Sequence, residues 1–131
     1  PIQFNKILQS QGYTVFVLGT DLKQFAIYTS PHIGQNIQMH IAGQIKPRPY
    51  TYDLINSIFK GLDIKILQVV IWDVQDTIYY ARLFIEQTIG EKKHILEIDA
   101  RPSDCLTLAL ENNIPTYCTK EVFEKTLPIE D

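Results

Sequence analysis

The middle of the chain contains three strand-like segments in direct succession, and this succession constrains the fold more than any other feature. The segments are Lys65–Trp72, Thr77–Glu86 and His94–Asp99, and they are rich in β-branched, aromatic and aliphatic residues. Polar turns at residues 73–76 and 90–93 join them. Short turns of this kind connect antiparallel strands, so the middle of the chain predicts a sheet built from hairpins.

Shorter elements on both sides complete the pattern. Further strands are expected at Ile2–Leu8, Tyr13–Leu18, Gln24–Tyr28 and Ile114–Cys118, and helices are expected to begin at Ser30-Pro31, Thr51, Pro102 and Thr119. Hairpins with inserted helices favour an α+β fold over a doubly wound parallel fold. We expect a mixed β-sheet with three main helices and a short C-terminal helix. At 131 residues the chain is expected to form one domain, residues 1–131.

The composition excludes several classes of function. The net charge is −3, so the chain lacks an overall basic field, and contact with DNA or RNA would need a local patch. The two cysteines, Cys105 and Cys118, are too few for a disulfide framework or a four-thiolate zinc site, which favours free thiols in a reducing compartment. No apolar run approaches the roughly 20 residues of a membrane-spanning helix, so we expect a cytoplasmic protein that does not enter the membrane. The chain begins at Pro1 instead of Met, which leaves room for a trimmed N-terminus or a short leader.

Two helix starts share the same chemistry. Each combines an Arg-Pro pair, a hydroxyl and a carboxylate, in the strings Arg48-Pro49-Tyr50-Thr51-Tyr52-Asp53 and Asp99-Ala100-Arg101-Pro102-Ser103-Asp104. A helix N-terminus presents unpaired N–H groups and a partial positive charge, so an added arginine creates a place where phosphate can bind. We therefore expect the phosphate-binding residues to be Arg48, Thr51, Arg101 and Ser103.

The carboxylates at these helix starts are the candidate catalytic residues. Asp53, Asp99 and Asp104 could hold a divalent cation or position a water, which are the needs of phosphodiester hydrolysis. If they act together, the two segments should lie close in space, with an arginine bonded to at least one carboxylate. A purely structural alternative is that Thr51 or Ser103 is an N-cap and that the acids only favour the helix dipole. Capping does not require Asp99, which ends a strand, and this position favours a site.

These residues also resemble the bifunctional nuclease domain family, which was formerly a domain of unknown function. The likeness runs from about Phe25 to Lys125 and is most specific in the string from Asp99 to Asp104. Tyr80-Ala81-Arg82-Leu83 in the hairpin fits the family pattern as well. The resemblance implies a compact α+β domain, often a homodimer, with DNase and RNase activity.

The chain departs from the family pattern at two positions. The family usually has histidine where this chain has Tyr52, and a phenol with a reference pKa near 10 replaces a possible general base. The family also usually carries a glutamate in the helix after the first hairpin, where this chain has Ile33. If both positions serve chemistry, this chain is a weak or inactive member.

Other residues give weaker signals. His32 and His40 lie eight residues apart on one expected helix, but a third metal ligand is not apparent. Tyr79, Tyr80 and Arg82 could form a platform for single-stranded nucleic acid.

Two hypotheses remain. The first is a nuclease acting on DNA or RNA, with a divalent metal as an open question. The second is a non-catalytic dimeric interaction or regulatory module.

Overall fold

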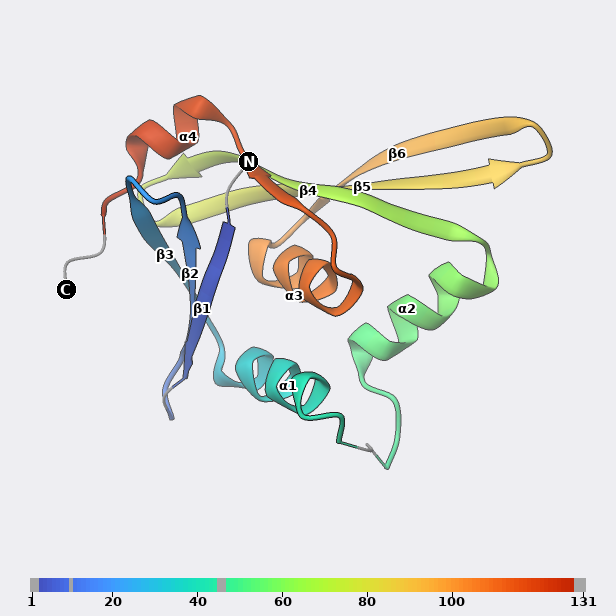
Figure 1. The fold of residues 1–131 in the computed structure, drawn as a ribbon, viewed down its shortest axis with the longest axis horizontal. Coiled ribbons are helices and arrows are strands. Elements are labelled where there is room, and N and C mark those ends of the chain that lie inside the picture. The colour runs from blue at the N-terminus through green and yellow to red at the C-terminus, as the bar shows by residue number, and fades with distance from the viewer. Residues whose placement is uncertain (1–2, 10, 45–46, 129–131) are drawn as a thin grey trace.

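The computed structural model describes residues 3–9, 11–44 and 47–128, and it contains four helices and seven strands in that part of the chain (Figure 1). The elements are β1 (Gln3–Gln9), β2 (Thr14–Gly19), β3 (Gln24–Thr29), α1 (Pro31–Ile41), α2 (Thr51–Gly61), β4 (Ile64–Gln75), β5 (Ile78–Ile89), β6 (Lys92–Ala100), α3 (Pro102–Asn112), β7 (Thr116–Cys118) and α4 (Lys120–Lys125). Their order is the predicted one, and the α+β class is confirmed. The expected start at Ile2 and the terminal residue Pro1 lie outside the described residues.

The strands form two sheets instead of the one sheet that the sequence predicts. β1, β2 and β3 make an antiparallel sheet, and β6, β5, β4 and β7 make a mixed sheet in which only β7 runs parallel to its neighbour β4. The sheets meet through side chains instead of through a shared edge. Phe25 of β3 stacks on Tyr79 of β5 with ring centroids 5.7 Å apart, and Phe123 of α4 meets the same phenylalanine at 6.3 Å.

The hairpin of β4 and β5 is longer than predicted. Residues 73–75 were expected in a turn, but they continue β4, and Asp73 and Gln75 pair with Tyr80 and Ile78. Only Asp76 and Thr77 remain in the turn, where Asp76 has a positive φ of 58°. Cross-strand pairing therefore continues up to a two-residue turn, the commonest connection in β-hairpins.

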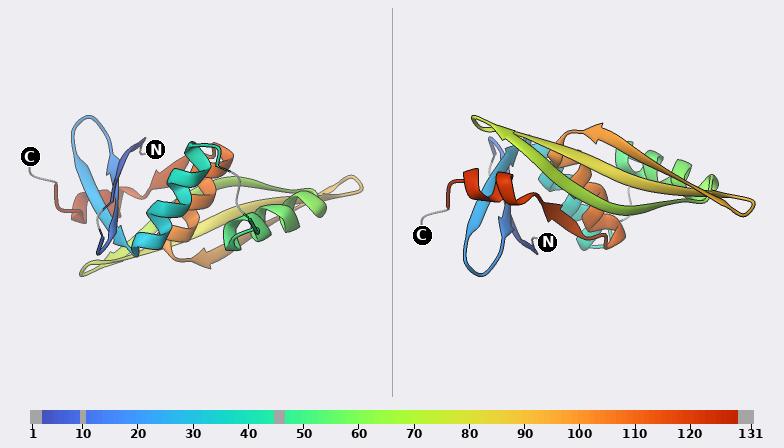
Figure 2. Two further views of the ribbon diagram at one scale, coloured as in Figure 1. Left: turned by 90° about the horizontal axis from the view of Figure 1, so that it is seen from below. Right: turned by 90° about the horizontal axis from the view of Figure 1, so that it is seen from above.

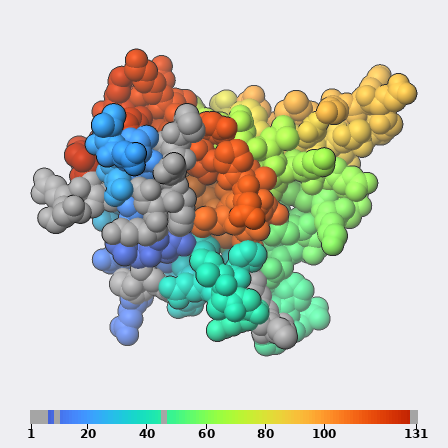
Figure 3. Space-filling view, in the orientation of Figure 1, coloured from blue at the N-terminus to red at the C-terminus, as the bar shows by residue number. Residues whose placement is uncertain are grey.

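The hairpin of β5 and β6 projects beyond the rest of the molecule, as the ribbon and space-filling views show (Figures 1, 2 and 3). On β5 the alternation follows the prediction, with Ala81, Leu83 and Ile85 buried. On β6 every residue from Lys92 to Asp99 is exposed. The outer strand of this sheet is therefore covered on neither face by the described part of the chain.

α3 is the central helix of the core. It contacts β4 and β5 on one side and α1 on the other (Figure 1). Cys105, Leu106 and Thr107 are each at most 1% exposed, and Thr107 donates a 2.7 Å bond to the Ser103 carbonyl. Asn113 ends the helix in the left-handed conformation, as predicted. No helix in the described ranges is long and apolar enough to cross a membrane.

Candidate functional site

The first turns of α2 and α3 lie side by side. Tyr52 in α2 is 8% exposed, and its hydroxyl donates a 2.6 Å hydrogen bond to Oδ1 of Asp104 in α3. Arg101 precedes the same helix, and its Nε and Nη2 donate bonds of 2.8 Å and 3.2 Å to Oδ2 and Oδ1 of Asp104. The expected contact between an arginine and a carboxylate is therefore present. We call Tyr52, Arg101 and Asp104 the helix junction.

The contacts at the helix junction fix the protonation states of its members. Burial acts to raise the pKa of the Asp104 carboxyl, but the bonds from Arg101 and Tyr52 outweigh burial and hold that pKa below its usual value. Burial, together with the bond to Asp104, raises the pKa of the Tyr52 phenol. Asp104 is thus an ionised acceptor and Tyr52 a neutral donor at physiological pH. A phenol held in this state cannot serve as a general base.

Asp53 caps α2 instead of joining the helix junction. Its Oδ2 accepts a 2.7 Å hydrogen bond from the backbone N–H of Tyr50, which is the N-cap residue. Thr51 is therefore the first residue of the helix, as predicted, and it is not the N-cap that the structural alternative offered. The same correction applies to Ser103, because Arg101 occupies the N-cap position of α3 and Pro102 the first turn.

The remaining predicted residues differ widely in exposure. Arg48 and Thr51 are exposed, whereas Ser103 is 6% exposed. Asp99 occupies an exposed position of β6, opposite Arg82 of β5. The side chain of Arg82 instead bonds Glu97 at 3.4 Å and lies 4.5 Å from the Trp72 ring.

The predicted acids do not gather into a metal centre. Over residues 3–9, 11–44 and 47–128, no three histidine, cysteine, aspartate or glutamate side chains are grouped so that they could hold a metal ion. Neither the set Asp53, Asp99 and Asp104 nor the histidines provide such a group. Cys105 is also unsuited to nucleophilic chemistry, because burial raises the pKa of its thiol to about 12.

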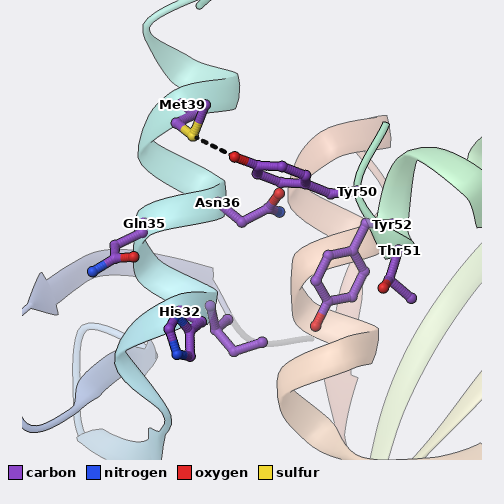
Figure 4. Close-up of a pocket in the computed structure, with 8 residues that line it drawn as sticks. His32, Gln35, Asn36, Met39, Tyr50, Thr51 and Tyr52 are labelled. Atoms are coloured by element: carbon purple, nitrogen blue, oxygen red, sulfur yellow. Dashed lines mark hydrogen bonds between the residues drawn. The ribbon is translucent and has the colours of Figure 1, made fainter. Parts of the chain in front are cut away.

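A pocket of about 260 Å³ lies beside the helix junction, between α1 and the start of α2 (Figure 4). Its walls are His32, Ile33, Gln35, Asn36, Met39, Tyr50, Thr51 and Tyr52. Ile33 and Tyr52, the positions at which the resemblance implies a glutamate and a histidine, therefore face one cavity. Tyr52 joins this cavity to the helix junction through its bond to Asp104.

Asn36 is the residue of this site that the sequence interpretation missed. It is 6% exposed, and within the described part of the chain neither atom of its amide has a hydrogen-bond partner. An unsatisfied buried polar group costs about 1–3 kcal/mol. A signal was available in the sequence, because Asn36 falls within the apolar stripe of α1 between Ile33 and Ile37.

Comparisons with known proteins confirm the resemblance that the sequence indicates. The sequence profile of the bifunctional nuclease domain matches residues 17–129. An uncharacterized protein of Mycobacterium tuberculosis is 34% identical over 94 residues, which is 69% of this chain and 53% of the relative. Bifunctional nuclease 1 of Oryza sativa subsp. japonica is 24% identical over 76 residues, 58% of this chain and 23% of the plant protein. The chain thus spans about half the length of the mycobacterial relative and less of the plant one.

Proposed function

Because the chain belongs to the bifunctional nuclease domain family, we propose that it binds single-stranded DNA or RNA at the helix junction and hydrolyses phosphodiester bonds slowly. One observation carries the proposal: Arg101 and Asp104 meet Tyr52 where two helix N-termini adjoin. Helix N-termini attract phosphate, and a guanidinium adds a charged donor.

Exposure distinguishes the roles of the residues. The side chain of Arg101 is 76% exposed, and Arg48 and Thr51 are exposed as well, so these three would contact phosphate. Ser103 is buried, so we assign it a structural role. Its carbonyl accepts a hydrogen bond from Thr107 within α3. Asp104, with a side chain 29% exposed, is bonded to Arg101 of this phosphate site and would accept the proton of the attacking water.

The same contacts predict a low rate. Asp104 is a weak base because its pKa is lowered, and its oxygens already accept bonds from Tyr52 and Arg101. Asp53 is committed to its capping bond with the Tyr50 N–H. Asp99 stays a proposed auxiliary carboxylate at the end of β6.

The test compares Arg101→Ala with Lys125→Ala, which removes an exposed cation at the end of α4. Fluorescent single-stranded RNA and DNA are incubated with each protein in Mg²⁺, Mn²⁺, Ca²⁺ or Zn²⁺. We expect Arg101→Ala to raise the activation free energy of cleavage by about 2–4 kcal/mol and to weaken binding, while Lys125→Ala changes neither. Wild-type protein that neither binds nor cleaves these strands would contradict the proposed function.

A second candidate function is a homodimeric interaction module, and the exposed β6 strand favours it. Ile95 and Leu96 are 61% and 58% exposed on a long edge strand, a feature that proteins normally cover. β6 begins with Lys92 and Lys93 and ends with acidic residues, so two antiparallel copies would place opposite charges together. We propose that a second copy of the chain covers β6 in either function.

A further inference from the structure

The pocket between α1 and α2 has chemistry of its own. We propose that it binds the adenine base of a single-stranded nucleic acid, with the amide of Asn36 bonding the edge of the base. The inference rests on the proposed nucleic-acid function and adds to it a base-binding subsite.

The state of Asn36 is the first observation behind this proposal. The side chain extends from α1 toward Tyr50 and Tyr52 (Figure 4). It is 6% exposed and lines the pocket, and its Nδ2 and Oδ1 have no hydrogen-bond partner among the described residues. Buried amides are nearly always bonded, so this amide is suited to a ligand that offers one donor and one acceptor.

The lining of the pocket favours an uncharged group. It consists of an imidazole, two amides, a thioether, an aliphatic side chain, two phenols and a threonine, without carboxylate, lysine or arginine. Ile33 and Tyr52 contribute an aliphatic and a phenolic surface to it. The volume of about 260 Å³ lies just below the range of about 300–1,000 Å³ that is usual for drug-sized ligands, which suits a single base.

Aromatic side chains provide the surface on which a base can stack. Tyr50, which is 40% exposed, and Tyr52 both line the pocket. Bases of single strands stack on such rings in many proteins. Rotation of the exposed Tyr50 side chain, which now donates a 3.6 Å contact to Sδ of Met39, would open the amide of Asn36 to the base.

The amide chemistry selects adenine over guanine. The donor and acceptor of asparagine match N7 and the N6 amino group of adenine, whereas guanine offers only acceptors at its corresponding edge. The phosphate of the same nucleotide would then be directed to Arg101, because Tyr52 lines the pocket and also bonds Asp104, the carboxylate that Arg101 contacts.

The experiment uses uncharged nucleosides, so that phosphate does not contribute. Adenosine carries an amino group at position 6 of the base, where inosine carries a carbonyl. Each nucleoside is titrated into the protein, and its binding is measured by calorimetry. We expect adenosine to bind at least about tenfold more tightly than inosine. Asn36→Leu should remove this preference without lowering the melting temperature, because it replaces an unsatisfied amide by an apolar group. Gln38→Leu, at an exposed position of the same helix outside the pocket, is the matched control.

A second readout covers the case in which Asn36→Leu fails to fold. In wild-type protein, the NMR signal of the Asn36 side-chain amide should shift with adenosine and not with inosine. Equal binding of both nucleosides, no binding, or adenosine binding that survives Asn36→Leu would overturn the base pocket. RNA binding that depends on Arg101 would then leave the proposed function intact. Adenosine binding through Asn36 without RNA binding or cleavage would instead remove the proposed function and keep the pocket.

Discussion

The phenol of Tyr52 and the carboxylate of Asp104 are joined by a 2.6 Å hydrogen bond, although 52 positions separate them in the chain. The bond connects the first turns of two helices that each begin at or just after an Arg-Pro pair. It places a neutral donor against an ionised acceptor, a type of hydrogen bond that contributes about 1.5–3 kcal/mol. It also occupies an oxygen of the carboxylate that bonds Arg101.

Removing the Tyr52 hydroxyl should therefore destabilise the fold. We expect Tyr52→Phe to lower the free energy of unfolding by about 1.5–3 kcal/mol, because Asp104 stays partly buried and loses the phenol donor, keeping only the bonds from Arg101. Urea denaturation measures the change. Tyr50→Phe is the matched control, because the Tyr50 side chain is 40% exposed and its hydroxyl faces a thioether at 3.6 Å. A loss of equal size in both variants would argue against a special role for the bond between Tyr52 and Asp104.

The lowered pKa of Asp104 predicts an acid-dependent part of the stability. The folded-state pKa lies below the unfolded value of about 3.9, so this contribution is fully present above that value and disappears as pH falls through the folded pKa. Asp104→Asn should consequently cost most near neutral pH and progressively less in acid. Unfolding curves of both proteins from about pH 6 to about pH 2 test this expectation. A difference that stays constant over the series would show that the charge of Asp104 does not matter.

Tyr52 predicts the opposite behaviour in alkali. Its folded-state pKa is raised above the unfolded value of about 10, so its contribution is fully present below that value and is lost as pH rises toward the folded pKa. We expect the stability advantage of wild-type protein over Tyr52→Phe to shrink above about pH 10. Burial also raises the pKa of the Tyr79 phenol, so tyrosinate absorbance in wild-type protein should report two late-ionising phenols. Tyr52→Phe should lose one of them, and an unchanged late titration in that variant would contradict the assignment to Tyr52.

The sequence identified most residues of the site but not the contacts between them. Local signals were sufficient for the helix starts, because Pro102 and the acids of the first turn act within a few residues. The bond from Tyr52 to Asp104 could not be predicted, since it depends on how α2 packs beside α3. The separation into two sheets likewise depends on the packing of Phe25 on Tyr79, a contact between distant segments. Local capping also explains why Thr51 is not the N-cap, because Asp53 bonds the N-cap N–H of Tyr50 from within the helix.

The exposed edge of the molecule gives a prediction about assembly. We expect wild-type protein to form a dimer at micromolar concentration and Ile95→Lys to shift it toward monomer, because a buried lysine would lack a partner at the interface. Ile78→Lys is the matched control, since Ile78 and Ile95 are both 61% exposed but Ile78 lies at the opposite end of β5 from the projecting turn. Light scattering distinguishes the states. A wild-type monomer, or dimers unaffected by Ile95→Lys, would rule out β6 as the interface.

Restoring the family residues should raise cleavage. Ile33 and Tyr52 line one pocket, so Ile33→Glu combined with Tyr52→His places a carboxylate and an imidazole together beside Asp104. An imidazole with an ordinary pKa near 6.5 is a far better general base at neutral pH than the phenol that it replaces. We expect the double variant to cleave single-stranded RNA about 10²–10⁴-fold faster than wild type, the usual contribution of general acid–base catalysis.

The control for this experiment is Ile33→Gln with Tyr52→Phe, which changes the same positions without adding an ionisable group. Thermal unfolding of both double variants is measured in parallel, because Ile33 is 8% exposed and a glutamate there loses apolar contacts. Faster cleavage in the His and Glu variant alone would place the chemistry at the pocket beside Asp104. A folded double variant that stays as slow as its control would instead favour the dimeric interaction module, because neither restored group would then have a phosphodiester to act on.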